Sequence, residues 1–148
     1  MCPEQNGCGV HNATLEIDGP EVPILDGSAV PFVTKILAAG LTPQAAPVRA
    51  IRVLRPVEVT NGAARARLSP DDTLRIEFTI EFEDAAIGVQ TKSLNMSNGS
   101  FVRELSNSRT FCRKADVDMM RANGLALGGT LENAVVVDGE RVLSPGGL

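Results

Sequence analysis

Residues 73–82, with the sequence TLRIEFTIEF, constrain the fold more than any other run in this chain. Apolar and polar side chains alternate along the run, which is the period of a β-strand with one buried face. The expected apolar face consists of Leu74, Ile76, Phe78, Ile80 and Phe82, and the expected polar face of Arg75, Glu77, Thr79 and Glu81. A sheet built around such a strand needs one face covered, and we expect helices to cover it.

Shorter elements are predicted before this strand. Alternation and turn residues predict extended segments at residues 13–17, 21–25, 48–59 and 62–68, the last two joined in a hairpin at Asn61-Gly62. A helix capped by Ser28 is expected to run through Leu37 and to end at Gly40. Residues 41–47 contain two prolines and no periodicity, so they are predicted to be a linker.

After the long strand, the pattern predicts a strand at residues 87–96 and a helix capped by Ser97 or Asn98 that runs through Leu105. A second helix is expected at residues 114–122, ended by Asn123-Gly124. Residues 134–138 and 141–143 flank Asp138-Gly139 as a hairpin. Both strands and helices are therefore expected along the chain.

Composition excludes several classes of protein. The 148 residues are 43% hydrophobic and 22% charged, and no apolar run reaches the roughly 20 residues of a membrane helix, so we expect a soluble protein without a transmembrane segment. The net charge of −4 without a basic tract, and aromatic residues that are all Phe, argue against binding of nucleic acid. Three cysteines, an odd number, and no secretory segment indicate a cytoplasmic protein.

Metal and acid–base motifs are weak. His11 is the only histidine, so a histidine relay or a multi-histidine metal site has at most one ring to use. Cys2, Cys8 and His11 have the spacing C-x5-C-x2-H, which is not a standard zinc pattern and lacks a fourth ligand. We interpret the acidic groups at 71–72, 81–84 and 116–118 as solvated, and Gly128-Gly129 as a flexible strand entrance.

Thr110 is a stronger candidate. Its hydroxyl lies between Arg109 and Phe111 at the expected exit of a helix, where it could donate a hydrogen bond to a developing oxyanion. The alternative is that the hydroxyl bonds to the last carbonyl groups of the helix, as Ser and Thr often do. The residue pattern leaves both hypotheses open.

Six runs in this order resemble one family. They are GCGVHNATLEIDGPEVPILDGSAVPFV at 7–33, IRVLRPVEV at 51–59, LRIEFTIEF at 74–82, AIGVQ at 86–90, SRTF at 108–111 and GLALGGTLENAVVVDGERVL at 124–143. Together they resemble UDP-3-O-acyl-N-acetylglucosamine deacetylase, a zinc amidase of bacterial lipid A synthesis. The resemblance covers nearly the whole chain, and the runs IDGPEVPILDGS and SRTF are specific to that family.

The resemblance implies two α+β domains, each a sheet layered on helices, with the active site between them. Residues 1–47 are expected to be the rear part of the first domain, and residues 48–148 the front part of the second. A βαβ insert that forms a tunnel for the acyl chain is expected near residues 112–143.

The resemblance also implies a reaction and its residues. The family removes an N-acetyl group from a UDP-linked acylated amino sugar, using zinc, a glutamate base and a threonine that helps to hold the oxyanion. Thr110 matches that threonine, Phe111 an aromatic ring of the substrate cleft and Phe82 a ring that contacts the nucleotide. Asp116, Val117 and Gly129 match positions of the insert, where they are expected to contact substrate.

Departures from the family pattern affect the metal site. The family's first zinc histidine and its glutamate lie in a V-E-H-L-M-A-A-L helix, whose place is taken here by MCPEQN. The other ligands lie in an H-K-x-x-D helix after the R-V-L segment, and the chain ends at Leu148 before such a helix. His11 stands where the family often has aspartate, so no residue is assigned as a metal ligand. Cys112-Arg113-Lys114 replaces the aromatic end of the family's T-F-G-F run.

Two hypotheses follow. The first is an incomplete deacetylase that retains Thr110 and part of the substrate wall but is inactive as an isolated chain. The second is a noncatalytic remnant of the fold that binds a UDP-sugar or acts as an interaction protein. In either case, loss of covering helices is expected to expose apolar faces and to favour self-association.

Overall fold

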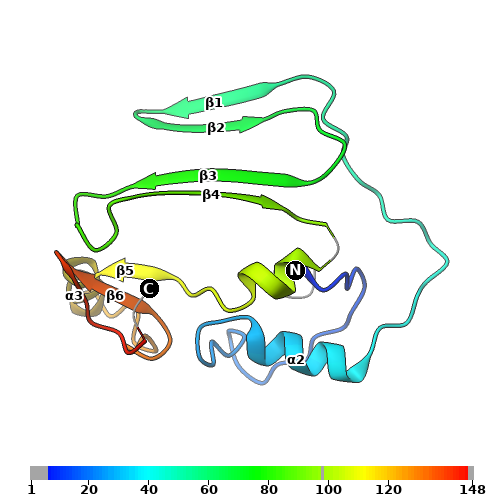
Figure 1. Ribbon diagram of the computed structural model, residues 1–148. Coiled ribbons are helices and arrows are strands. Elements are labelled where there is room, and N and C mark those ends of the chain that lie inside the picture. The colour runs from blue at the N-terminus through cyan, green and yellow to red at the C-terminus, as the bar shows by residue number, and fades with distance from the viewer. Residues whose placement is uncertain (1–6, 98, 147–148) are drawn as a thin grey trace.

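The computed structural model describes residues 7–97 and 99–146 and contains both helices and strands. The elements in chain order are α2 (Val30–Ala39), β1 (Val57–Asn61), β2 (Ala64–Leu68), β3 (Arg75–Glu81), β4 (Val89–Asn95), a π-helical turn (Phe101–Leu105), β5 (Phe111–Arg113), α3 (Lys114–Ala122), β6 (Val135–Asp138) and β7 (Arg141–Val142). In Figure 1, the first four strands cross the upper part of the molecule, and α2, β5, β6 and α3 lie below them. The predicted α+β class is confirmed.

The first four strands form two separate hairpins. β1 pairs antiparallel with β2 around Gly62, which has a φ of 58°, and Val57 lies opposite Leu68. β3 pairs antiparallel with β4 in a register that sets Ile76 opposite Leu94. Glycine is suited to this left-handed turn, which confirms the hairpin predicted at Asn61-Gly62.

The third sheet has three strands in the order β5-β6-β7. β5 and β6 are parallel, and α3 connects them and contacts both. β6 and β7 are antiparallel around Gly139, as the sequence predicts. The helix predicted at residues 114–122 is confirmed with the same bounds.

The main core lies where this sheet meets the end of β3. Ile87, Val135 and Val137 are buried there, and Val137 is fully buried. Partly buried side chains that pack against them are those of Ile80, Phe82, Ala86, Phe111 and Val142. The buried Ser144 hydroxyl accepts a hydrogen bond from the Val136 N–H at 2.9 Å and donates one to the Ala134 carbonyl at 2.6 Å.

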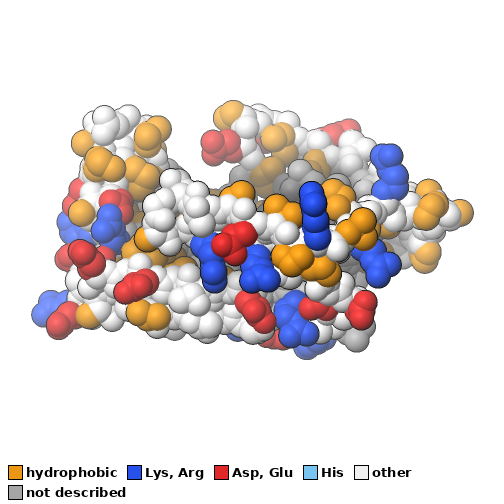
Figure 2. Space-filling view, turned by 90° about the horizontal axis from the view of Figure 1, so that it is seen from above, with side chains coloured by type: hydrophobic (Ala, Val, Ile, Leu, Met, Phe, Trp, Pro, Cys, Tyr) orange, Lys and Arg blue, Asp and Glu red, His pale blue; other side chains and the backbone are white. Residues whose placement is uncertain are grey.

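The long strand is confirmed, but the expected helical cover is wrong over half of its length. Ile80 and Phe82 pack on the core, whereas Ile76 and Phe78 remain 39% and 43% exposed. The reason is that α3 packs on β5 and β6 rather than across the hairpin. On the face that carries β1 and β2, hydrophobic side chains also remain open to solvent (Figure 2), among them Val57, Val59 and Leu68.

Three other expectations differ from the structure. Residues 13–17 and 21–25 adopt no regular structure, and only residues 57–61 of the extended run 48–59 form a strand. A short extended segment is stable as a strand only when it pairs with another, and these segments have no pairing partner among the described strands. The helix expected near residues 97–105 is a single π-helical turn; Asn98, its alternative cap, lies outside the described residues.

Helix α2 begins one residue later than predicted. Its N-cap is Ala29 rather than Ser28, although the Ser28 hydroxyl still accepts the Val30 N–H at 3.3 Å. Gly40 ends the helix as predicted, with a φ of 81° and its N–H bonded to the Ile36 carbonyl at 3.1 Å. None of the described helices has the length and apolar character needed to cross a membrane.

Candidate functional site

Phe82 and Phe111 contact each other in the structure. Phe82 directly follows β3, and its N–H bonds to the Gly88 carbonyl at 3.0 Å, while Phe111 opens β5 opposite Val135. Their ring centroids are 5.2 Å apart with an interplanar angle of 85°, an edge-to-face pair. Two residues that the resemblance assigns to the substrate wall therefore form one aromatic unit on the core.

Thr110 immediately precedes this aromatic unit. Its backbone is fixed, because its carbonyl accepts the N–H of Val135 at 2.9 Å, and its side chain is exposed. Within residues 7–97 and 99–146 the Thr110 hydroxyl has no hydrogen-bond partner. The hypothesis that it bonds to the preceding helical carbonyls is therefore wrong, and the hydroxyl is available to a ligand.

Asp116 is engaged by Arg113. The Arg113 guanidinium donates to both carboxylate oxygens, from Nε at 2.8 Å and from Nη2 at 3.1 Å, and lies 4.0 Å from a carboxylate oxygen of Asp84. The hydrogen bond from Arg113 lowers the pKa of Asp116, and the same bond raises the pKa of Arg113. This bidentate pair keeps Asp116 ionised and fixes it in the first turn of α3.

Val117 and Gly129 belong to α3 and to the loop that follows it. Val117 is partly buried on α3, one residue after Asp116. The Gly129 carbonyl accepts a hydrogen bond from Nη2 of Arg121 at 2.9 Å, at the other end of that helix. This hydrogen bond ties the loop between α3 and β6 to the C-terminal end of α3. Gly129 therefore contacts Arg121 rather than Thr110.

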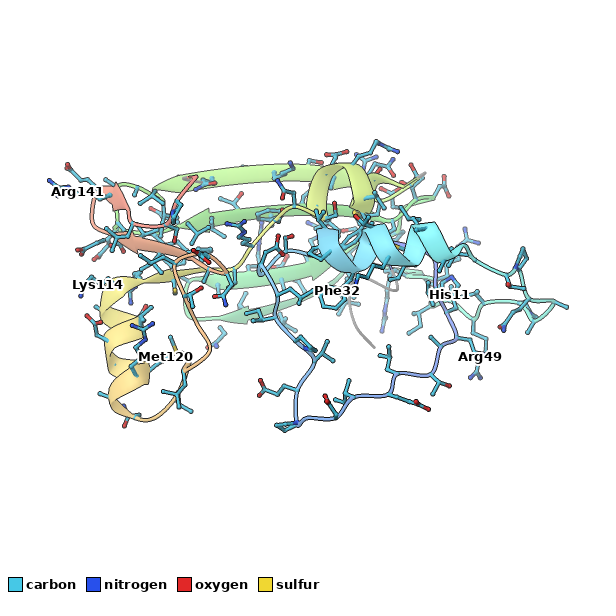
Figure 3. All side chains as sticks on the ribbon, turned by 90° about the horizontal axis from the view of Figure 1, so that it is seen from below. His11, Phe32, Arg49, Lys114, Met120 and Arg141 are labelled. Atoms are coloured by element: carbon cyan, nitrogen blue, oxygen red, sulfur yellow. The ribbon has the colours of Figure 1, made fainter. Side chains whose placement is uncertain are left out.

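Of the weak N-terminal metal pattern, the structure describes only Cys8 and His11. In the described part of the chain, no group of three or more His, Cys, Asp or Glu side chains could hold a metal ion, and Cys2 lies outside that part. His11 is exposed and lies far from Lys114 and Arg141 (Figure 3). The residues that the structure describes therefore do not fit the zinc ion that the resemblance implies.

Cys112, beside Phe111, is a free thiol. Burial is the main cause that raises its pKa, and the charge of Asp116 adds to the effect. Its sulfur lies 3.9 Å from the Val135 carbonyl oxygen. A neutral thiol in this position packs against β6 and is a poor nucleophile.

A turn at Asp26, Gly27 and Ser28 packs beside the Thr110 segment, and the sequence analysis assigned it no function. Oδ1 of Asp26 accepts the Ser28 N–H at 3.0 Å and the Ser28 hydroxyl at 2.9 Å. Ser28 is buried. The hydrogen bond from its N–H is the main reason that the pKa of Asp26 is lowered, and the charge of Arg109 makes a smaller contribution in the same direction. The signal in the sequence was the DGS triplet inside a family-specific run.

The turn fits closely against the loop before β6. Gly27 has a φ of 78°, and a Cβ atom at this position would lie 1.8 Å from the backbone oxygen of Asn133. The Ala29 N–H bonds to the Ser106 carbonyl at 2.9 Å, so the next residue of the chain also contacts the segment that leads to Thr110. Glycine is the only residue that both the turn and this close approach accept.

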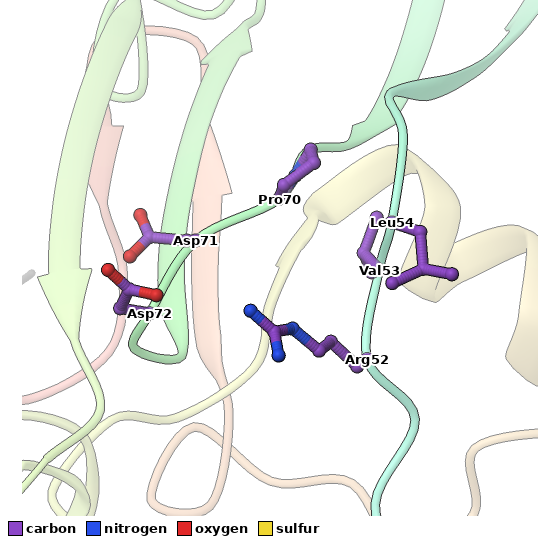
Figure 4. A pocket seen from close by; sticks show the side chains of 6 residues that line it. All are labelled: Arg52, Val53, Leu54, Pro70, Asp71 and Asp72. Carbon is purple, nitrogen blue, oxygen red and sulfur yellow. The ribbon is translucent and has the colours of Figure 1, made fainter.

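An open hollow of about 280 Å³ lies elsewhere, between the segment that leads into β1 and the loop before β3 (Figure 4). Its lining residues are Arg52, Val53, Leu54, Pro70, Asp71 and Asp72. Asp71 is engaged locally, since it accepts the Thr73 N–H at 3.0 Å and lies 3.5 Å from Nε of Arg75. None of the predicted site residues lines the hollow, so we do not place the site there.

Comparison with known proteins agrees with these motifs. A family model described as UDP-3-O-acyl N-acetylglycosamine deacetylase matches residues 5–148. A protein of Phenylobacterium zucineum (strain HLK1), named UDP-3-O-acyl-N-acetylglucosamine deacetylase, is 50% identical over 140 residues, which are 95% of this chain and 48% of that protein. Proteins of the same name from Shewanella sp. (strain W3-18-1) and Methylococcus capsulatus (strain ATCC 33009 / NCIMB 11132 / Bath) are each 46% identical over 144 residues, 96% of this chain and 47% of their own length.

The chain thus spans about half the length of the curated relatives that it matches. The family model, in contrast, matches nearly every residue of the chain, including the turn at Asp26, the SRTF run and the β5-α3-β6 unit. This chain belongs to the UDP-3-O-acyl N-acetylglycosamine deacetylase family.

Proposed function

We propose that this chain supplies an oxyanion-binding threonine and part of the substrate wall for the hydrolytic N-deacetylation of UDP-3-O-acyl-N-acetylglucosamine, a step of lipid A synthesis. One observation carries the proposal: the Thr110 hydroxyl has no partner among the described residues, while its backbone is fixed next to the Phe82–Phe111 pair. The names of the relatives support the substrate class, a UDP-linked acylated amino sugar.

The proposed division of labour follows from the chemistry of each group. The hydroxyl of Thr110 donates a hydrogen bond to the amide oxygen as negative charge develops on it. The faces of Phe82 and Phe111 offer apolar, polarisable surface to the nucleotide and the sugar. Asp116, held ionised by Arg113, accepts hydrogen bonds from ligand hydroxyl or N–H groups. Val117, on α3, and Gly129, at the other end of that helix, contact the more distant part of the substrate.

No residue of this chain receives a metal-binding role in the proposal. The family chemistry is zinc-dependent, but the described residues offer no ligand group and His11 is the only imidazole in the sequence. We therefore propose that the isolated chain binds zinc below stoichiometry and does not release acetate from substrate.

The proposal also includes the domain division and the location of the chain. We assign residues 1–47 to a first α+β domain and 48–148 to a second, with the insert near 112–143; the β5-α3-β6 unit supports the last assignment. We propose a cytoplasmic location, which agrees with the free thiol of Cys112 because a reducing compartment preserves thiols.

Titration of the chain with UDP, followed through the backbone amide signals, tests the proposed surface. We expect shifts at Phe82, Thr110 and Phe111, and none at Asp72, which serves as the internal control in the distant hollow. A flat titration at all three residues would show that the surface does not bind the nucleotide. Stoichiometric zinc together with acetate release from the acylated UDP-sugar would refute the proposed inactivity of the isolated chain.

A second candidate function is supported by the uncovered sheet face. Ile76 and Phe78 are 39% and 43% exposed on the apolar side of β3, and exposed apolar patches commonly mark interaction sites. In this alternative the chain is a noncatalytic fold remnant that associates with itself or with another protein. Sedimentation measures the oligomeric state of the native chain and of Phe78→Asp. If the native chain associates with itself through this face, the Phe78→Asp variant is monomeric where the native chain is not.

A further inference from the structure

The turn that joins β3 to β4, residues 82–88, lies against the sheet of β5, β6 and β7 (Figure 1). At the end of the turn that leads into β4, the Ala86 N–H bonds to the Gly139 carbonyl at 3.1 Å, and Ile87 is buried in the core. These contacts fix that end of the turn to β6 and β7. The end that follows β3 is attached in a different way, through side chains.

Two side-chain pairs join this second end to β5. Phe111 and Arg113 are two residues apart in β5, so their side chains lie on the same face of the strand. The ring centroid of Phe111 lies 5.2 Å from that of Phe82. Nη1 of Arg113 lies 4.0 Å from Oδ2 of Asp84, which is two residues after Phe82. The aromatic pair and the ion pair are therefore neighbours between the turn and β5.

The direction of the Arg113 side chain is set by α3. Its Nε and Nη2 atoms donate to the two carboxylate oxygens of Asp116 at 2.8 and 3.1 Å, an arrangement of fixed geometry. The remaining Nη1 atom is the one that meets Asp84, whose side chain is only 19% exposed. An ion pair with an exposed partner adds little to stability, but here it determines where the turn meets β5.

We propose that Asp84 and Arg113 are positioning residues, which hold the end of β3 against β5 so that the rings of Phe82 and Phe111 keep one edge-to-face arrangement. The use of that arrangement, as a fixed aromatic surface for the nucleotide and the sugar, rests on the proposed function. The arrangement itself is a property of the ligand-free chain. The basic residue that departs from the family's T-F-G-F run thus acts within the site.

The test measures the aromatic proton signals of Phe82 and Phe111 by NMR in the full ligand-free chain. In an edge-to-face pair, the edge protons of one ring lie over the face of the other ring, whose ring current moves their signals upfield. The signals return toward those of an isolated phenylalanine when the rings separate. An ion pair that only stabilised the fold would change the melting temperature and leave these signals of the folded chain in place.

Variants of Asp84 separate charge from shape. Asp84→Asn removes the charge that Arg113 meets, and Asp84→Glu retains a charge. Asp118→Asn is the matched control, because Asp118 pairs with Lys114, the residue next to Arg113, at 2.6 Å. Both asparagine variants remove one carboxylate from an ion pair at the start of α3, but Asp118 belongs to α3 and not to the turn. Arg113→Gln removes the other partner and serves if Asp84→Asn fails to fold, since Arg113 is exposed.

We expect the upfield shifts to be lost in Asp84→Asn and Arg113→Gln and retained in Asp84→Glu and Asp118→Asn. Native shifts in either of the first two variants overturn the proposal. Equal losses in Asp84→Asn and Asp84→Glu also overturn it, because charge is then not the link, and so does an equal loss in Asp118→Asn, because any change of charge on α3 then moves the rings. UDP titration of the native chain remains separate: a flat titration refutes the proposed function and leaves the ring signals unaffected.

Discussion

Replacement of Val137 by alanine is expected to destabilise the chain more than the same replacement of Val135 or Val136 in β6. Val137 is fully buried at the centre of the three-stranded sheet, where it lies opposite Arg113 of β5 and Val142 of β7. The change removes two carbon groups, each contributing about 0.8 kcal/mol by burial, and leaves a cavity that neighbours fill only in part, so the loss is about 2–3 kcal/mol. A small domain has a total stability of only about 5–15 kcal/mol.

Val89→Ala is the matched control. Val89 is also a strand residue, paired with Glu81, but it is 66% exposed. Both variants therefore change strand propensity in the same way, and only Val137→Ala opens a cavity. Because about a third of the Val89 side chain is buried, its truncation is expected to reduce the burial term by about 0.5 kcal/mol.

Urea unfolding followed by far-UV circular dichroism measures both variants, since the chain has no Trp or Tyr to report by fluorescence. The expected result is a lower midpoint for Val137→Ala at an unchanged m-value, with a difference between the two variants of about 1.5–2.5 kcal/mol. Equal losses in the two variants would refute the assignment of the stabilising core to the sheet around β6.

Three further predictions concern other contacts. Ser144→Ala removes a buried hydroxyl that bonds to two backbone groups. It is expected to lower the free energy of unfolding by about 1–3 kcal/mol in the same urea assay, and a loss below about 0.5 kcal/mol would show that water replaces the hydroxyl. Gly27→Ala is expected to lower the melting temperature well below that of Gly40→Ala, because both glycines have a φ near 80° but only Gly27 abuts Asn133; equal melting temperatures would contradict the close approach. The hydrogen bond from Arg113 lowers the pKa of Asp116 from 3.8, so the ion pair stabilises the fold above pH 3.8 and this stabilisation is lost as the pH falls through the folded pKa. The free energy of unfolding of Asp116→Asn should therefore fall less steeply with decreasing pH than that of the native chain. An equal pH dependence in the two chains would count against the pair.

Local signals in the sequence were sufficient for elements that depend on their own residues. The helix at residues 114–122 has an acidic residue, Asp116, in its first turn and a basic residue, Arg121, in its last turn, as the helix dipole favours. Its Lys114 and Asp118 side chains, one turn apart, form an ion pair of 2.6 Å. The hairpins at Gly62 and Gly139 each have a glycine where the backbone enters the left-handed region. These features are set within a few residues and need no distant partner.

Features that depend on distant residues were not predictable in the same way. The alternation in residues 73–82 identified the strand correctly, but which element covers Phe78 depends on where α3 packs. Residues 13–17 alternate well and still form no strand, because no described strand pairs with them. Phe82 and Phe111 were assigned only through the family motifs, since spacing along the chain does not show that the two rings meet. Thr110 was a candidate from its local sequence, but that sequence left its role open.

The separation of the strands into three sheets determines the order in which the chain opens. A two-stranded hairpin with few buried side chains is only marginally stable alone, and all five residues of β1 and of β2 are exposed. Local unfolding should therefore begin in β1 and β2, continue through the outer half of β3 and β4, and reach β6 only when the whole chain unfolds. The proposed substrate surface around Thr110 is bonded to β6 through Val135, so it belongs to the last part of the molecule to exchange its amide hydrogens, while the hairpins above it open and close many times.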